Sequence, residues 1–167
     1  VVYRIAPTKT ADSVTIDDCA PDDRAASPAS CSDGSVPLLP VQRIALSLWG
    51  DEIDALVSSY CYELGRPTSA SSLQKALGLL VERHDALRLK IGRTEKGEWG
   101  QRLLDVVPAP DSMCRVVDLS AMDEAEAAIL MAQQILVLQG EIDVAKGCLL
   151  QAALFEFGPG RSQRLAM

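Results

Sequence analysis

The sequence contains a single histidine, and this scarcity limits the chemistry that the chain itself can perform. His84 is the only imidazole among 167 residues, and the five cysteines are scattered without a Cys-x-x-Cys spacing. We therefore expect no zinc site built from His and Cys ligands. We expect the cysteines to be reduced thiols of a cytoplasmic protein, with Cys61 and Cys148 buried.

Long apolar runs and basic runs are also missing. No stretch approaches the roughly 20 apolar residues that a membrane helix needs, and the first residues lack the pattern of a signal peptide. The net charge is −7, and no basic cluster is present that would replace counterions on nucleic-acid phosphates. We expect neither a membrane nor a nucleic-acid partner. The chain also begins without Met, and we expect it to be a piece of a longer protein.

The composition changes at Val36. Residues 1–35 are mostly Asp, Ser, Thr, Ala, Pro and Gly, which bury too little apolar surface to offset the entropy of ordering them. We interpret 1–35 as a flexible linker, with a docking segment for a neighbouring module as the alternative. Residues 36–167 have the apolar content of one ordinary domain.

Hydrophobic periodicity predicts an alternation of helices and strands over 36–167. The expected helices cover 40–49, 72–83 with Ser71 as its cap, and about sixteen residues that Ser120 opens, with Gly140 just past the end. The expected strands cover 56–64, 86–91, 99–104, 113–117, 148–157 and 161–167. This order favours an α+β fold, a two-layer sandwich with a mostly antiparallel sheet and helices on one face. We expect the last strand to leave an open edge that promotes self-association.

The last expected helix has a predicted buried stripe at helical spacing, and acidic residues gather near its start. The stripe consists of Ala125, Ile129, Ala132 and Leu136. The acidic residues are Asp118, Asp123 and Glu124. We attribute them to the favourable interaction of carboxylates with a helix N-terminus rather than to metal binding.

His84 and Asp85 are the candidate catalytic residues of the chain. They could form a base and its orienting partner, but adjacent side chains usually point in different directions. The alternative is structural: His84 stands at a helix-to-strand corner, which Arg83 and Arg88 would hold by pairing with acidic groups or carbonyls. No Gly-x-Ser-x-Gly elbow or Gly-rich phosphate loop is present.

Four segments resemble known motifs. Leu39-Pro40-Val41-Gln42 resembles the opening motif of nonribosomal peptide synthetase condensation and epimerization domains, and Arg83-His84-Asp85-Ala86-Leu87-Arg88 resembles their second motif. The segments 117–120 and 142–155 are similar to the connecting regions of that superfamily. The resemblance implies structural roles for the motif residues Pro40, Gln42, Arg83, His84, Asp85 and Arg88.

The resemblance also implies a fold and a function. The fold would be a chloramphenicol-acetyltransferase-like lobe, the N-terminal half of a two-lobe domain. The catalytic motif His-His-x-x-x-Asp-Gly is absent, and we expect it to follow Met167 in the whole enzyme. We therefore expect no catalytic, cofactor-binding or metal-binding residue in residues 36–167. The expected partners are a peptidyl carrier domain, which delivers phosphopantetheine, and the C-terminal lobe.

The reaction would be epimerization or peptide-bond formation on carrier-bound aminoacyl or peptidyl thioesters. The Gly97-Glu98-Trp99 turn and residues 154–165 are similar to epimerization domains, which favours that subtype. Ile44-Ala45 departs from it, because epimerization domains tend to carry Trp-Phe there. Two alternatives stay open: a non-catalytic module that docks a carrier protein, and a stand-alone acyltransferase of the same fold that uses coenzyme A or a carrier.

Overall fold

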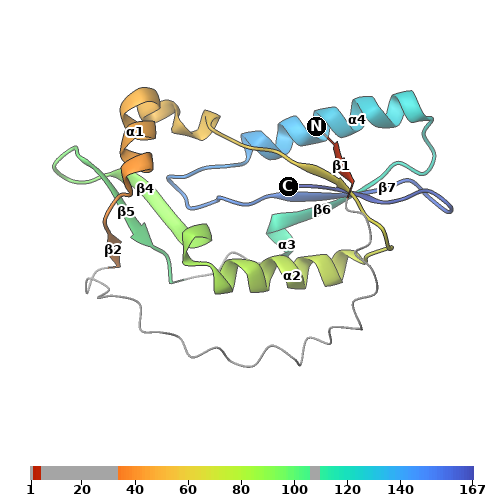
Figure 1. Ribbon diagram of the computed structural model, residues 1–167, viewed down its shortest axis with the longest axis horizontal. Coiled ribbons are helices and arrows are strands. Elements are labelled where there is room, and N and C mark those ends of the chain that lie inside the picture. Colours follow the sequence, from red (N-terminus) through yellow and green to blue (C-terminus); the bar gives the residue numbers. More distant parts are fainter. Residues whose placement is uncertain (1, 5–33, 106–109) are drawn as a thin grey trace.

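The computed structural model describes residues 2–4, 34–105 and 110–167. Within these ranges the chain forms two sheets and several helices (Figure 1). Most of the expected linker, residues 5–33, lies outside the described residues. The flanking residues Val2–Arg4 and Ser35 belong to strands, and the domain boundary at Val36 stays a prediction.

The larger sheet has five strands in the order β1-β3-β8-β7-β6. These are β1 (Val2–Arg4), β3 (Cys61–Glu63), β8 (Arg164–Ala166), β7 (Ala152–Glu156) and β6 (Cys114–Asp118). The two outer pairs, β1·β3 and β6·β7, are parallel, whereas β8 is antiparallel to both of its neighbours.

The smaller sheet has three antiparallel strands in the order β2-β5-β4. These are β2 (Ser35–Val36), β5 (Trp99–Leu103) and β4 (Leu89–Arg93). The hairpin of β4 and β5 is therefore confirmed. Over both sheets, four of the six described pairings are antiparallel, as the sequence predicts.

The helices connect these strands. They are α1 (Pro40–Trp49), α2 (Ala70–Arg83), α3 (Pro110–Met113) and α4 (Glu124–Gly140), with the 3-10 helices η2 (Gly50–Ala55) and η3 (Asp85–Arg88). The bounds of α1 are those expected from Pro40 at its first position. No helix among the described residues has both the length and the apolar character to cross a membrane.

Helices cover both faces of the larger sheet, and the expectation of one covered face is wrong (Figure 1). Successive β7 side chains point to opposite faces: Ala153 and Phe155 pack in the cluster that includes α4, and Ala152 and Leu154 pack in the one that includes α2. All four are fully buried. The α+β class is confirmed, with a helix layer on each side of the sheet.

Two helices begin at other residues than the sequence predicts. Ser69, not Ser71, caps α2, because its hydroxyl accepts the backbone N–H of Ser72 at 3.2 Å. Asp123, not Ser120, caps α4, and its carboxylate accepts the N–H of Glu126 at 2.9 Å. Asp118 instead accepts the N–H of Ser120 at 2.8 Å, and hydrogen bonding from the Ser120 side chain and backbone lowers the pKa of the carboxyl. Of the acidic cluster, Asp123 caps the helix, Asp118 holds the preceding turn, and Glu124 lies in the first turn of α4.

The predicted buried stripe of α4 is wrong. Ile129 and Leu136 are 62% and 66% exposed, and the buried residues are Ala127, Met131 and Leu138. The helix is apolar on all sides, so that periodicity alone cannot identify the inner face. The prediction that β8 forms an open edge is also wrong, because β8 is the central strand.

Strand lengths differ from the sequence prediction as well. The expected strand over 56–64 is reduced to Cys61–Glu63. The expected strand over 86–91 begins only at Leu89, because a 3-10 turn over Asp85–Arg88 comes first. Cys61 is buried as predicted, whereas Cys148 is only half-buried.

Candidate functional site

The first motif joins α1 to β5 through a chain of side-chain amides. The backbone N–H of Leu39 donates to Oε1 of Gln42 at 2.7 Å. Nε2 of Gln42 then donates to Oε1 of Gln101 at 2.9 Å, and Nε2 of Gln101 donates to the carbonyl of Pro37 at 2.8 Å. Gln101 is 6% exposed and is the one buried polar side chain in the described part of the molecule. A buried amide requires such partners.

The second motif joins the end of α2 to the end of β5. Nη1 of Arg88 donates to the carbonyl of Leu104 at 3.0 Å, while the backbone N–H of Leu104 donates to the carbonyl of Arg88 at 2.9 Å. Nη2 of Arg88 forms an ion pair with Asp85. The Arg88 side chain is 13% exposed, and its Nε is buried without a hydrogen-bond partner among the described residues. Arg88 thus makes the acid and carbonyl contacts expected of it.

The structure does not pair His84 with Asp85. The backbone N–H of His84 caps α2 by donating to the carbonyl of Leu80 at 3.0 Å. The residue is exposed, and no hydrogen bond of its imidazole is found within the described ranges. The Asp85 carboxylate is engaged by Arg88 instead. The pair considered for catalysis, His84 as the base with Asp85 as its orienting carboxylate, is therefore not formed.

An apolar cavity lies beside the second motif. Its volume is about 260 Å³. Val81, Leu87, Leu104, Met113 and residues 146–151 contribute to its lining. Its polar lining residues are Ser112, Lys146, Cys148 and Gln151. Just before β7, Nε2 of Gln151 donates to Sγ of Cys148 at 3.1 Å. Small-molecule sites are also lined mainly by apolar side chains with a few polar groups, but they usually measure about 300–1,000 Å³, so this cavity is smaller than a typical one.

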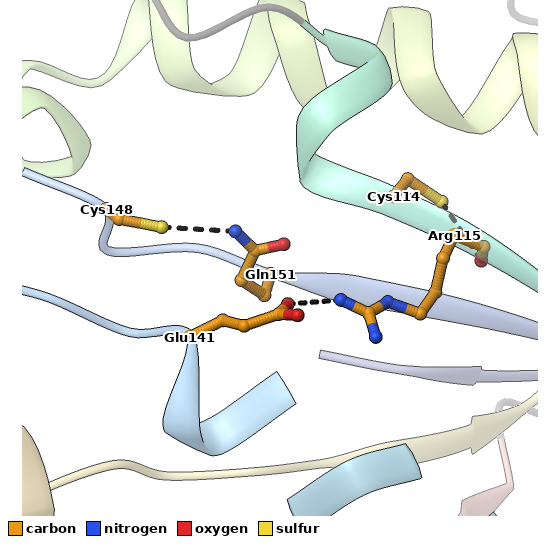
Figure 2. A network of polar contacts seen from close by, with 5 residues as sticks. All are labelled: Cys114, Arg115, Glu141, Cys148 and Gln151. Carbon is orange, nitrogen blue, oxygen red and sulfur yellow. Dashed lines mark hydrogen bonds and ion pairs between the residues drawn. The ribbon is translucent and has the colours of Figure 1, made fainter. Parts of the chain in front are cut away.

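Several polar contacts lie where β6 begins and just before β7 (Figure 2). Arg115 of β6 reaches Glu141 at the end of α4 in an ion pair, and Gln151 turns its amide toward Cys148. On the other side, Nε2 of Gln139 donates to Oγ of Ser59 at 3.0 Å. Sequence reasoning missed these contacts because most of them join residues far apart in the chain.

The described residues contain no group of three or more His, Cys, Asp or Glu side chains that could hold a metal ion. Asp143 pairs with Lys146, which lines the cavity. The hydrogen bond from Lys146 lowers the pKa of the Asp143 carboxyl. The site therefore consists of an apolar cavity, two structural motifs and a few neutral or paired polar groups.

Comparison with known proteins identifies the protein family of this chain. The family model "Condensation domain" matches residues 32–165. This match spans most of the chain and includes both motifs. The chain therefore belongs to the condensation-domain family of nonribosomal peptide synthetases.

The relatives are large synthetases. The chain is 31% identical over 129 residues to malformin synthetase of Aspergillus sclerotiicarbonarius, with 77% of this chain aligned. It is 30% identical over 149 residues to HC-toxin synthetase of Cochliobolus carbonum, with 81% of this chain aligned. The aligned part spans only 2% and 3% of the two relatives' own lengths.

Solved structures share the fold. The epimerization domain from the third module of tyrocidine synthetase B superposes with a TM-score of 0.65 at 23% identity, covering 80% of this chain and 29% of that domain chain. The first condensation domain of the CDA synthetase superposes with a TM-score of 0.60 at 21% identity, covering 80% and 35%. These similarities confirm the condensation-domain fold.

Proposed function

We propose that this chain is the N-terminal lobe of a nonribosomal peptide synthetase domain that acts on carrier-bound aminoacyl or peptidyl thioesters in the cytoplasm. The observation that carries the proposal is the family match over 32–165 together with a fold that spans about a third of the solved two-lobe domains. The C-terminal lobe and a peptidyl carrier domain are the partners that this assignment requires. The carrier would deliver the substrate on its phosphopantetheine arm.

The register of β8 supports a proposal for where the catalytic segment lies. Leu154 of β7 pairs with Leu165 of β8. Beyond β8, Met167 and Tyr60 exchange backbone hydrogen bonds of 2.8 and 2.9 Å. Residues that continued this antiparallel register past Met167 would run beside Gln151 and Leu150, along the wall of the apolar cavity. We propose that His-His-x-x-x-Asp-Gly lies there.

The proposed chemistry is proton transfer by a histidine of that segment. In epimerization, the base removes the α-proton of the thioester-bound residue, and a proton returns to the opposite face of the same carbon. In condensation, the histidine assists attack of an acceptor amine on the thioester carbonyl, with release of the carrier thiol. The chain's own residues would hold the lobe together through Gln42 and Arg88 and line the cavity near the reacting group.

We favour the epimerization subtype. The Gly97-Glu98-Trp99 turn and residues 154–165 support it, and the epimerization domain of tyrocidine synthetase B is among the structures that superpose well. Because a condensation domain superposes with a similar TM-score, the experiment must distinguish the two reactions.

The test uses the reading frame as it continues past Met167. A two-lobe protein produced from that frame is mixed with a carrier protein loaded with an L-aminoacyl group in deuterated water. We expect deuterium at the α-carbon and a mixture of enantiomers by chiral chromatography. Peptide formation with a second loaded carrier, without deuterium at that carbon, would assign condensation instead. Turnover by the 167-residue chain alone, or a stop codon in place of the motif, would contradict the proposal.

A further inference from the structure

The smaller sheet carries two cations directly opposite one another. Lys90 of β4 pairs in register with Arg102 of β5, and Arg102 pairs on its other side with Ser35 of β2. The three side chains therefore form one row across the sheet, on the same face. The neighbouring residues Ile91 and Gln101 are buried on the opposite face, which places this row on the open face of the sheet.

The next row of the same face has no side chains. Gly92 of β4 pairs in register with Gly100 of β5. A Cβ on Gly92 would meet no atom within 4 Å, whereas a Cβ on Gly100 would lie 3.0 Å from the methyl group of Thr94. The sheet backbone is thus open at Gly92 beside the two cations, whereas the methyl group of Thr94 covers Gly100. The hollow there has a volume of about 470 Å³.

One acidic residue, Glu95, lines the hollow beside this row of charges. Two neighbouring arginines have acidic partners, since Arg88 of η3 pairs with Asp85 and Arg93 of β4 pairs with Asp51. No ion pair is found for Lys90 or Arg102 within the described residues. Like charges at directly opposite positions destabilise a strand pair, and a bound anion would remove this repulsion.

We propose that Lys90 and Arg102 bind the phosphate group of a phosphate ester. A guanidinium group binds phosphate through two parallel hydrogen bonds, and an ammonium adds a point charge. The open position at Gly92 provides space for the rest of the ester. The phosphate group has two possible sources, a free nucleotide and a phosphopantetheine arm. The proposal does not depend on the proposed catalytic activity, because it rests only on this sheet.

The experiment is calorimetric titration of the 167-residue chain at fixed ionic strength. The probes are inorganic phosphate, ADP, 4′-phosphopantetheine and pantetheine, which lacks the phosphate group. We expect the phosphorylated probes to bind and pantetheine not to bind. Preference for 4′-phosphopantetheine over ADP would assign the site to the carrier arm, and the reverse preference would assign it to a nucleotide.

Variants separate this site from general electrostatic attraction. Lys90→Gln with Arg102→Gln removes both cations, and we expect Kd to rise about tenfold for each charge lost. The matched control, Arg66→Gln with Lys75→Gln, makes the same charge change at exposed positions elsewhere, and its Kd should stay within about twofold of wild type.

The conservative double variant Lys90→Arg with Arg102→Lys keeps both charges and should retain binding, with circular dichroism to confirm that each variant is folded. Absence of binding to the wild-type chain would overturn the proposal. Equal affinity of the Gln variants and wild type, equal loss in the control, or equal binding of pantetheine would overturn it as well.

Discussion

Gln42 donates its side-chain amide to Gln101 at 2.9 Å, although 59 positions separate the two residues in the sequence. The contact joins α1 to β5. Because Gln101 is 6% exposed, its accepting oxygen has no ready replacement from water. This hydrogen bond should therefore contribute more to stability than an exposed one.

The first prediction concerns this contact. Gln42→Ala should lower the free energy of unfolding by about 1–3 kcal/mol, because it leaves the buried Gln101 oxygen unsatisfied. Urea denaturation followed by circular dichroism measures the change. The control is Gln133→Ala, an exposed glutamine of α4, which should stay within about 0.5 kcal/mol of wild type. Similar effects of the two substitutions would contradict the structural role of Gln42.

The second prediction ranks three residues of the Arg-His-Asp corner. Arg88→Ala should be the most destabilising, by about 2–3 kcal/mol, because it removes the partner of the Leu104 carbonyl and leaves a gap at a side chain that is 13% exposed. Asp85→Asn should cost about 0–1 kcal/mol, because Asp85 is 56% exposed. His84→Ala should cost below about 0.5 kcal/mol.

Thermal unfolding of the three variants side by side tests the order. The family resemblance alone gives no reason to rank the arginine above the histidine; the ranking comes from burial and hydrogen bonding. A His84→Ala variant less stable than Arg88→Ala would show that the corner is held by the imidazole. The ranking would then be wrong.

Local patterns were enough to predict the parts of the fold that depend on neighbouring residues. Pro40 marks the start of α1, and helical spacing predicts a buried stripe on α2 of Leu73, Leu77, Leu80 and Val81. Three of these four are buried, whereas Leu80 is 39% exposed. These features follow from backbone geometry and helical periodicity. The motif residues Gln42 and Arg88 were selected differently, through short segments that resemble a family.

Long-range partners could not be predicted from the same patterns. Nothing near Gln101 marks it as the buried partner of Gln42, and nothing near Arg115 points to Glu141. The inner face of α4 was missed because Ile129 and Leu136 are as apolar as the buried Met131. A helix that is apolar on all sides needs its tertiary neighbours to define the buried face.

The third prediction concerns the cysteines. Burial raises the pKa of the Cys61 and Cys114 thiols, so both stay protonated at a pH at which an exposed thiol begins to ionise. Since the thiolate is the reactive form, both should be alkylated at least about tenfold more slowly than the half-buried Cys148 at pH 8. Brief labelling with N-ethylmaleimide and peptide mass spectrometry measures the rates. In urea the three rates should converge; if the differences persisted there, burial would not be their cause.

The last prediction compares two glycines with the same backbone conformation. Gly147 and Gly160 both have φ of +78°, a region that costs a non-glycine residue about 1–2 kcal/mol. A Cβ on Gly160 would meet no atom within 4 Å, but a Cβ on Gly147 would lie 2.5 Å from Cδ1 of Leu104. Gly147→Ala should therefore destabilise the chain by about 1–3 kcal/mol more than Gly160→Ala.

The source of the extra cost can be isolated because Leu104 also lines the apolar cavity. In a Leu104→Ala background the clash disappears, so Gly147→Ala should then cost no more than Gly160→Ala. The two substitutions at 104 and 147 should be non-additive, as expected for residues in contact. Additive free energies of unfolding would mean that Leu104 moves into the cavity without penalty. Leu104 could then change position in the cavity wall without cost. The packing of Leu104 against Gly147 would not fix the shape of the cavity.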